Sequence, residues 1–270
     1  MKIRTAFFLP AAAILSLSLL RADGPSATEL SGKLSAAVLD NSSVARLKMD
    51  FSANGKKTVL QLKADARRTS AASDVRYLVL WPKERKGESF VLRKSGNQAA
   101  TGLVFLPPAS LKPLSPSQMQ DGIFGSDLAY ADLVENYFAW ANQSLVGEET
   151  VNRAACQILE SKPGKGDRSG YGSVKTWVDT QRMVPLKIEK YAPNGQLIRR
   201  ITITLCAKDD TGRLIPANFR VERPGDQSVT TMEGSNIKHD VPLTDADFSP
   251  ESLRSPAAKD SPNPHAGAGL

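Results

Sequence analysis

Residues with reactive side chains are few, and their spacing does not assemble a familiar catalytic group. His239 and His265 are the only histidines among the 270 residues, whereas a Ser/His/Asp triad or a histidine-rich metal site needs such side chains to converge. The glycine-rich segment 163–167 lies between two predicted strands, while a phosphate-binding loop opens a helix. We interpret this segment as a long hairpin turn.

Three carboxylates, Asp127, Asp132 and Glu135, are close enough in sequence to share one face of a helix. Paired carboxylates can carry out acid/base chemistry, but helix capping and a solvated polar face are the more frequent roles of such residues. We therefore expect no enzyme activity, no catalytic residue, no bound metal and no cofactor.

Cys156 and Cys206 are the only two cysteines. In a simple meander they would lie three strands apart, roughly 14 Å at the usual strand spacing, whereas a disulfide tolerates a Cα separation of about 7 Å. Alternation also puts them on different faces of the sheet. We expect the two thiols to remain unpaired.

The first residues have the pattern of a secretory signal peptide, because Lys2 and Arg4 precede an apolar run over residues 6–20. The run is shorter than the roughly 20 residues that a membrane-spanning helix needs. We expect cleavage near Ala22, export to the periplasm and a protein that does not span a membrane. The expected organisation is a signal peptide over 1–22, a binding domain over 23–251 and a disordered tail over 252–270.

The basic character of the chain weakens once the signal peptide is set aside. The net charge of +7 includes Lys2, Arg4 and Arg21, and the remainder holds 32 basic and 28 acidic residues. A nucleic-acid surface needs clustered Lys and Arg with exposed aromatic residues, but here the basic residues mostly occupy the polar side of predicted strands. We therefore expect no nucleic-acid partner.

Apolar residues at every second position dominate the chain and predict strands. Val184, Leu186 and Ile188 alternate with Lys187 and Glu189, and the apolar residues around Ile203 alternate with Thr202 and Thr204. The predicted strands are 45–51, 60–64, 76–81, 89–94, 102–106, 153–161, 173–179, 184–191, 196–206, 213–222 and 227–238. Because so many twisted strands seldom form a flat open sheet, we predict a half-open antiparallel barrel.

Two helical regions are expected to cover the concave face of this barrel. Thr28 could cap a helix through residue 40 that carries one apolar stripe of Leu30, Leu34 and Val38. An insertion over Leu111–Asn142 breaks the strand pattern, and Asp127 could cap a helix within it. We predict a gate in this insertion, formed by Met119, Gly122, Phe124, Gly125 and Leu128.

The inward positions of the predicted strands form the expected lining of a hydrophobic cavity. For each residue alone, ordinary core packing is the simpler interpretation; the hypothesis concerns the set, since a half-shell of this size has more interior than the helices need fill. The predicted lining residues are Leu47, Met49, Phe51, Leu60, Leu62, Val79, Trp81, Leu186, Ile188, Ile201, Ile203, Phe219 and Val221.

Several short motifs in order along the chain carry a family resemblance. They are Arg76–Val79, Trp81–Glu84, Ser115–Met119, Gly122, Gly125–Asp127, Asp132–Leu133, Gly147–Glu149, Trp177–Asp179, Pro185–Glu189 and Asp240–Leu243. Together they resemble the periplasmic outer membrane lipoprotein-sorting proteins, distant relatives of the lipoprotein carrier LolA. The resemblance implies a mainly β fold, a half-open barrel lidded by helices, with a hydrophobic cavity for acyl chains.

The resemblance also implies a function. The expected partners are acyl chains of a lipid or lipoprotein, and a transport partner at the inner or outer membrane. A carrier would deliver such cargo toward the outer membrane. Two alternatives remain open at this point: a periplasmic sensor or regulatory module that reads a lipid signal, and a structural envelope protein whose core is filled. The sequence leaves the cargo and the oligomeric state undecided.

Overall fold

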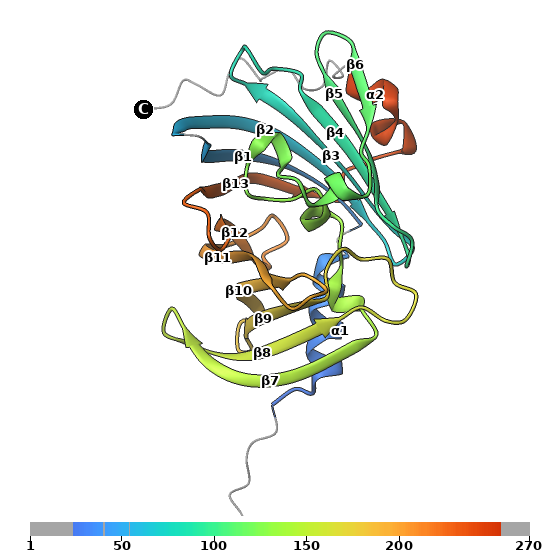
Figure 1. The fold of residues 1–270 in the computed structure, drawn as a ribbon. Helices are drawn as coiled ribbons and strands as arrows, with labels where there is room; N and C mark the ends of the chain where they lie inside the picture. Colours follow the sequence, from blue (N-terminus) through green and yellow to red (C-terminus); the bar gives the residue numbers. More distant parts are fainter. Residues whose placement is uncertain (1–23, 40, 54, 255–270) are drawn as a thin grey trace, which may run out of the picture.

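The computed structural model describes residues 24–39, 41–53 and 55–254. The predicted signal peptide and residues 255–270 of the predicted tail lie outside this part. Within it, one antiparallel sheet contains 13 strands (Figure 1). The strands are β1 (Asn41–Ala53), β2 (Lys56–Arg68), β3 (Ala72–Trp81), β4 (Ser89–Ser95), β5 (Thr101–Leu106), β6 (Ser110–Pro113), β7 (Asn142–Val151), β8 (Ala154–Lys162), β9 (Ser173–Asp179), β10 (Val184–Tyr191), β11 (Leu197–Lys208), β12 (Leu214–Glu222) and β13 (Val229–His239).

The first and last strands meet in the middle of the sheet. Strand β1 pairs with β2 on one side and with β13 on the other, so the sheet runs in the order β6 to β1 and then β13 to β7. Twisted strands in this number curl rather than lie flat. Figure 1 shows the resulting half-shell, with β6 and β7 as its two free edges. The predicted half-open barrel is confirmed.

Two strands were absent from the prediction. Strand β6 overlaps the start of the predicted insertion, and its four residues ending in Pro113 give too short a pattern to detect. Strand β7 has eight exposed residues out of ten, so it shows no apolar alternation. Alternation reports burial of one face, and a strand exposed on both faces lacks that signal.

The N-terminal helix α1 (Ala27–Val38) is capped by Ser26 and not by the predicted Thr28. The Ser26 hydroxyl accepts a hydrogen bond from the Glu29 amide, and the Glu29 carboxylate accepts one from the Ser26 amide, which is a capping box. Leu30 and Leu34 of the predicted stripe are buried in the main core. The helix packs against β7, β8 and the 3-10 turn η4 (Tyr137–Ala139).

The prediction of a helix beginning at Asp127 is wrong. Residues 117–139 instead form four short 3-10 turns: η1 (Ser117–Gln120), η2 (Ile123–Gly125), η3 (Ala131–Leu133) and η4 (Tyr137–Ala139). The Asp127 carboxylate accepts hydrogen bonds from the hydroxyls of Ser228 and Thr230, at 2.7 and 2.8 Å, so it joins the insertion to β13 rather than capping a helix. The turns, green in Figure 1, lie within the curve of the sheet and fill much of it.

The last described residues lie on the outer face of the shell. The turn η5 (Asp245–Phe248) and the helix α2 (Pro250–Arg254) place Phe248 and Leu253 against Val91 and Phe105 of β4 and β5. Residues 252–254 therefore belong to α2, although the sequence placed them in a tail.

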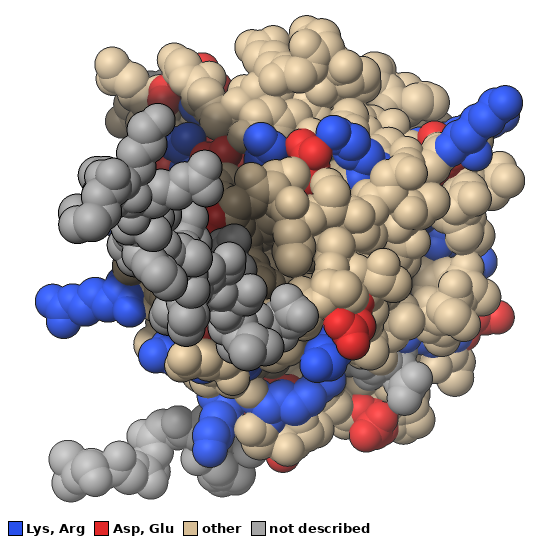
Figure 2. Space-filling view, turned by 90° about the horizontal axis from the view of Figure 1, so that it is seen from below, with Lys and Arg blue, Asp and Glu red and all other residues tan. Residues whose placement is uncertain are grey.

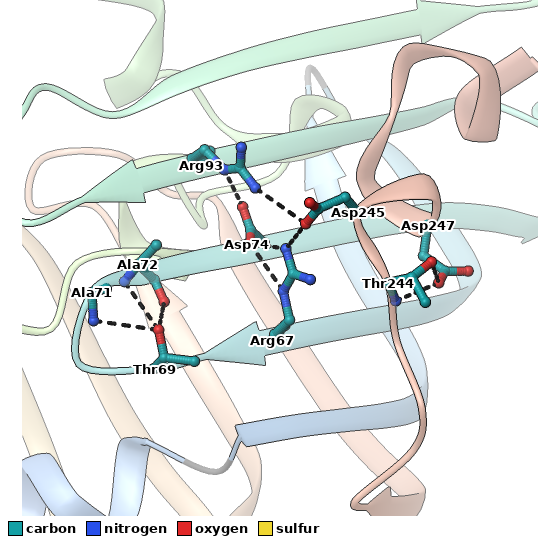
Figure 3. A network of polar contacts seen from close by, with 9 residues as sticks. All are labelled: Arg67, Thr69, Ala71, Ala72, Asp74, Arg93, Thr244, Asp245 and Asp247. Atoms are coloured by element: carbon teal, nitrogen blue, oxygen red, sulfur yellow. Dashed lines mark hydrogen bonds and ion pairs between the residues drawn. The ribbon is translucent and has the colours of Figure 1, made fainter.

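A polar network fixes this C-terminal segment to the sheet (Figure 3). Arg67 donates to Asp74 at 2.8 Å and to Asp245 at 2.5 Å, and Arg93 donates to Asp74 at 2.5 Å. Burial alone would raise the pKa of the Asp74 carboxyl, but the hydrogen bonds and charges of Arg93 and Arg67 outweigh it and lower that pKa. Arg67 thus joins the outer face of β2 and β3 to η5.

Candidate functional site: a cavity beside small wall residues

A cavity of about 410 Å³ lies between the sheet and the inner elements. Its wall is built by alanines that face inward on adjacent strands: Ala45 of β1 pairs directly with Ala64 of β2, and Ser43 pairs with Ala66. Further along the same two strands the inward pairs are large, as in Met49 with Leu60. The large pairs pack against the insertion, whereas the small side chains leave space.

The remaining lining contains both apolar and polar side chains. Apolar side chains come from α1, the sheet and the insertion: Ala37, Val38, Leu47, Tyr77, Leu133, Phe138, Ile215 and Ile237. The polar lining residues are Ser43, Arg68, Ser73, Asp132, Glu135, Asn136, Arg213 and His239. A volume of this size is within the range of ligand pockets, about 300 to 1,000 Å³, and the mixture suits an amphiphile.

A second hollow of about 580 Å³ adjoins the first across the segment 134–136. It lies among the hairpin turns at 69–73, the end of β4 and the loop at 164–167. Val134, Asn136 and Ser73 line both hollows. The Asn136 Oδ1 is buried without a hydrogen-bond partner among the described residues.

Buried ion pairs hold the insertion in the shell. The Asp132 carboxylate accepts hydrogen bonds from the Lys190 ammonium group of β10 at 2.7 Å and from the Tyr171 hydroxyl at 2.5 Å. The Arg199 guanidinium of β11 lies 3.4 Å from the same carboxylate. Burial alone would raise the pKa of Asp132, but the charges of Lys190 and Arg199 and the hydrogen bonds lower it to about 2. The three charged side chains are at most 3% exposed, so separating them would leave uncompensated charges in the interior.

A second set of buried charges lies three residues further along the insertion. Lys94 of β4 is 3.6 Å from Glu135 and 3.5 Å from Asp167. Burial raises the pKa of Glu135, and the charge of Lys94 opposes this effect. The segment beside both hollows is therefore attached to the wall by charges on each side.

The structure places most of the predicted lining residues in the packed core rather than at the cavity. Leu47 lines the cavity. Leu186 lies in a separate cluster with Cys156 and Trp177, and Trp81 is 50% exposed. The remaining ten belong to the main core or pack against it: Met49, Phe51, Leu60, Leu62, Val79, Ile188, Ile201, Ile203, Phe219 and Val221.

The residues of the predicted gate also lie in the interior. Met119 and Leu128 are buried, and Phe124 contacts the ring of Phe90. Gly122 forms a bridge with Ala129, and a Cβ at Gly122 would lie 1.6 Å from the Ser126 carbonyl oxygen. Glycine is therefore required by close packing here, and Gly125 has a φ of +89°. The gate remains a prediction.

Sequence reasoning missed the cavity-forming alanines, although a signal existed. Ala45, Ala64 and Ala66 obey the same alternation as their larger neighbours. The prediction selected bulky residues as the lining, but space remains where inward residues are small. The polar contributors from β13 and the β11–β12 turn depend on pairing between distant segments and had no local signal.

Three residues close together near the cavity are of types that can bind a metal ion. Ligand-type atoms of Asp209, Asp210 and His239 lie within 4.8 Å of one another. However, Arg213 donates to Asp209 at 3.1 Å, and its guanidinium is 3.1 Å from the His239 Nε2. Among the described residues, a cation already balances this cluster, and we assign no metal to it.

The two cysteines are unpaired in the structure. Cys156 is buried on β8, and Cys206 is half-buried on β11, with β9 and β10 between these strands. Burial raises the pKa of both thiols, which leaves them protonated and weakly reactive near neutral pH.

Charges of both signs are mixed over the molecular face shown in Figure 2, which is hollowed near its middle. In the described part of the chain, every helix is too short or too polar to cross a membrane.

Comparison with known proteins decides the family and the fold. A family model with the description "Uncharacterized protein" matches residues 73–255. The chain belongs to this family. No curated protein matches the chain.

Three crystal structures resemble this family member closely in fold. A DUF1329 family protein from Desulfovibrio piger has a TM-score of 0.77 at 24% identity, covering 84% of this chain and 97% of that chain. A domain named for outer membrane lipoprotein sorting, from Vibrio parahaemolyticus, has a TM-score of 0.74 at 19% identity, covering 85% and 98%. A LolA superfamily protein from Nitrosomonas europaea has a TM-score of 0.66 at 19% identity, covering 84% and 99%. The chain therefore has the LolA superfamily fold, and the resemblance found in the sequence is confirmed at that level.

Proposed function

We propose that the protein is a periplasmic carrier that shelters acyl chains of a lipid or lipoprotein in the cavity beside Ala45, Ala64 and Ala66 and delivers them toward the outer membrane. The observation that supports this proposal most directly is the space of about 410 Å³ between the sheet and the insertion. Burying about ten methylenes there is worth about 8 kcal/mol before ordering costs, which is enough for transport through water.

The contacts of the insertion favour a fixed plug over a moving gate. Asp127 and Asp132 join it to β10, β11 and β13 through buried hydrogen bonds and ion pairs. Loading would then require no movement of the insertion. A disulfide made by Asp127→Cys with Ser228→Cys separates the two ideas: a gate requires uptake to fail when the bond forms, and a plug leaves uptake unchanged.

The binding proposal is tested by filling the cavity. In Ala64→Phe the new ring would occupy the space beside Ala45, so binding of a fluorescent fatty acid should weaken at least about tenfold. Ala155→Phe, on an exposed position of β8, is the matched control and should bind normally. Circular dichroism establishes that both variants fold. Equal binding by Ala64→Phe and the control would contradict the proposal.

Carriage and sensing differ in the step after binding. A carrier should release the fatty acid rapidly to phospholipid vesicles, whereas a sensor should retain it and change its affinity for a protein partner. Native mass spectrometry of protein purified from its own periplasm would identify the resident lipid.

A further inference from the structure

Exposed apolar side chains lie at one end of the sheet, outside the lining of the cavity. Trp81, the last residue of β3, is 50% exposed, and Leu106, the last residue of β5, is 44% exposed. Pro107 and Pro108, which follow Leu106, are also exposed. Exposed apolar side chains that gather in one place mark an interaction surface. We call these four residues the apolar tip.

Strand pairing brings the members of the apolar tip to the same end of the sheet. Ser89, the first residue of β4, pairs with Leu78 of β3 and with Phe105 of β5. Strands β3, β4 and β5 are therefore neighbours, as Figure 1 shows. A Cβ on Gly87 would lie 3.2 Å from the Cγ of Pro107, so the turn between β3 and β4 touches the turn after β5.

The turn between β3 and β4 is fixed to its surroundings. The Gly87 amide donates to the Val79 carbonyl, and the Val79 amide donates to the Glu88 carbonyl, both at 2.9 Å. The Arg85 guanidinium donates to the Glu88 carboxylate at 2.6 Å and to the Phe124 carbonyl of the insertion at 3.2 Å. Because this support is held in place, the apolar tip needs little ordering when it binds.

Positive charge surrounds the apolar tip. Four exposed lysines at this end of the sheet form no ion pair within the described part of the chain: Lys56, Lys83, Lys86 and Lys112. In the turn 82–88, Glu84 is exposed, and the Glu88 carboxylate is neutralised by Arg85. The lysines therefore leave an excess of positive charge beside the apolar side chains.

This combination matches the surface of an anionic membrane. Tryptophan is favoured at membrane–water interfaces because its ring is largely apolar and its indole N–H is polar. Lysines are attracted to anionic lipids over about one Debye length, roughly 10 Å at 0.1 M salt. A second copy of the chain fits less well, because packing on the same residues would bring two sets of lysines together, and like charges repel.

We propose that the apolar tip and its lysines dock the protein on an anionic lipid surface, with Trp81 and Leu106 among the headgroups and Lys83 and Lys86 at lipid phosphates. From β3 the cavity is lined by Ser73 and Tyr77, whereas Trp81 ends this strand. Docking therefore goes beyond the proposed carriage of acyl chains, does not depend on it and can be measured separately.

Vesicle co-sedimentation tests the proposal, with protein purified from its own periplasm. Vesicles of phosphatidylglycerol should bind the parent at least about tenfold more tightly than vesicles of phosphatidylcholine. Raising the salt from about 0.1 M to about 1 M should remove this preference, as should the double change Lys83→Glu with Lys86→Glu. Trp81→Ser and Leu106→Ser should each weaken binding at least about fivefold.

Two substitutions on β11 are the matched controls. Leu205→Ser replaces a leucine that is 51% exposed, and Lys208→Glu replaces an exposed lysine. Five strands separate β11 from β3 in the sheet, so both variants should bind vesicles like the parent. Circular dichroism establishes that every variant folds. Trp81→Ser should still bind the fluorescent fatty acid normally, so a failure of docking is distinguishable from a failure of acyl binding.

Tryptophan fluorescence reports the contact with lipid directly. The other two tryptophans, Trp140 and Trp177, are 6% and 5% exposed, so a change on vesicle binding reports Trp81. Its emission should shift to shorter wavelength and be quenched by brominated lipid. Unchanged emission, equal binding to the two lipids, or parent-like binding by Trp81→Ser would overturn the proposal. A dimer in sedimentation that Trp81→Ser converts to a monomer would also overturn it, in favour of a second copy.

Discussion

The Asp132 carboxylate is the residue whose loss should cost most stability. Asp132→Asn would leave Lys190 and Arg199 buried without their counter-charge, and the free energy of unfolding should fall by about 3–5 kcal/mol. The matched change Asp50→Asn, in a solvent-exposed pair with Lys57, should cost less than about 1 kcal/mol. Chemical denaturation measures both, and similar losses in the two variants would contradict this account.

The same carboxylate gives the parent protein a defined acid response. The pKa of Asp132 falls from 3.8 to about 2 on folding. Its stabilisation is therefore complete above the unfolded value and is lost as the pH falls from about 4 toward 2. Asp132→Asn should lack this part of the pH dependence when stability is measured across that interval.

Alanine substitutions at two separate glycines, Gly122 and Gly32, give a second prediction at the residue scale. Gly122→Ala would place a Cβ 1.6 Å from the Ser126 carbonyl oxygen, so the insertion must shift and stability should fall by more than about 2 kcal/mol. Gly32→Ala, in the exposed middle of α1 with nothing within 4 Å, should instead stabilise by about 0.5–1 kcal/mol. Thermal unfolding distinguishes the two signs, and a gain at both positions would rule out the close contact at Gly122.

Residue patterns show what the sequence could and could not predict at this scale. Alternation correctly placed Met49, Leu60 and Val221 on the inner face, because burial of one face imposes a period of two. Alternation could not show that Asp132 contacts Lys190 and Arg199, since those contacts depend on where β10 and β11 lie relative to the insertion in the folded protein. Alternation also could not distinguish inward positions that pack in the core from inward positions that line the cavity. The two kinds of position differ only in the sizes of the paired side chains.

At the scale of elements, the C-terminal segment is held to the sheet mainly by apolar contact. Leu253 is 1% exposed against Val91 and Phe105, so Leu253→Ala should lower stability by about 2–4 kcal/mol. The Asp245 side chain is 86% exposed, and Asp245→Asn should cost less than about 1 kcal/mol although it removes the ion pair with Arg67. Hydrogen exchange should show residues 245–254 loosened only in Leu253→Ala; loosening of equal size in both would indicate that the ion pair is the main attachment.

Elements with a buried face were predictable, and elements held by distant contacts were not. The strands from 154 onward matched the alternation to within a few residues. A helix capped by Asp127 was predicted within the insertion, but Asp127 is bonded to β13 and the chain turns repeatedly instead. Tertiary hydrogen bonds of this kind override local helix signals.

At the scale of the whole molecule, the curl of one sheet creates both the core and the space beside it. Strand number and twist alone predicted the half-shell. The pairing of β1 with β13, which brings the cavity wall together, joins residues almost 200 positions apart, and local pattern carries no information on such a pairing. The size of the cavity therefore follows from register and from alanine positions, not from the number of apolar residues.

A cavity of fixed size predicts a limit on the acyl chain that it accepts. For single-chain amphiphiles from about 8 to about 18 carbons, each added methylene should tighten binding about fourfold while it is still buried. Affinity should then become constant, because carbons beyond the 410 Å³ space remain in water. Titration calorimetry across the series measures the break, and Ala64→Phe should move it to shorter chains. A steady rise with no break would mean that the shell opens further around longer cargo, and that the insertion is not fixed.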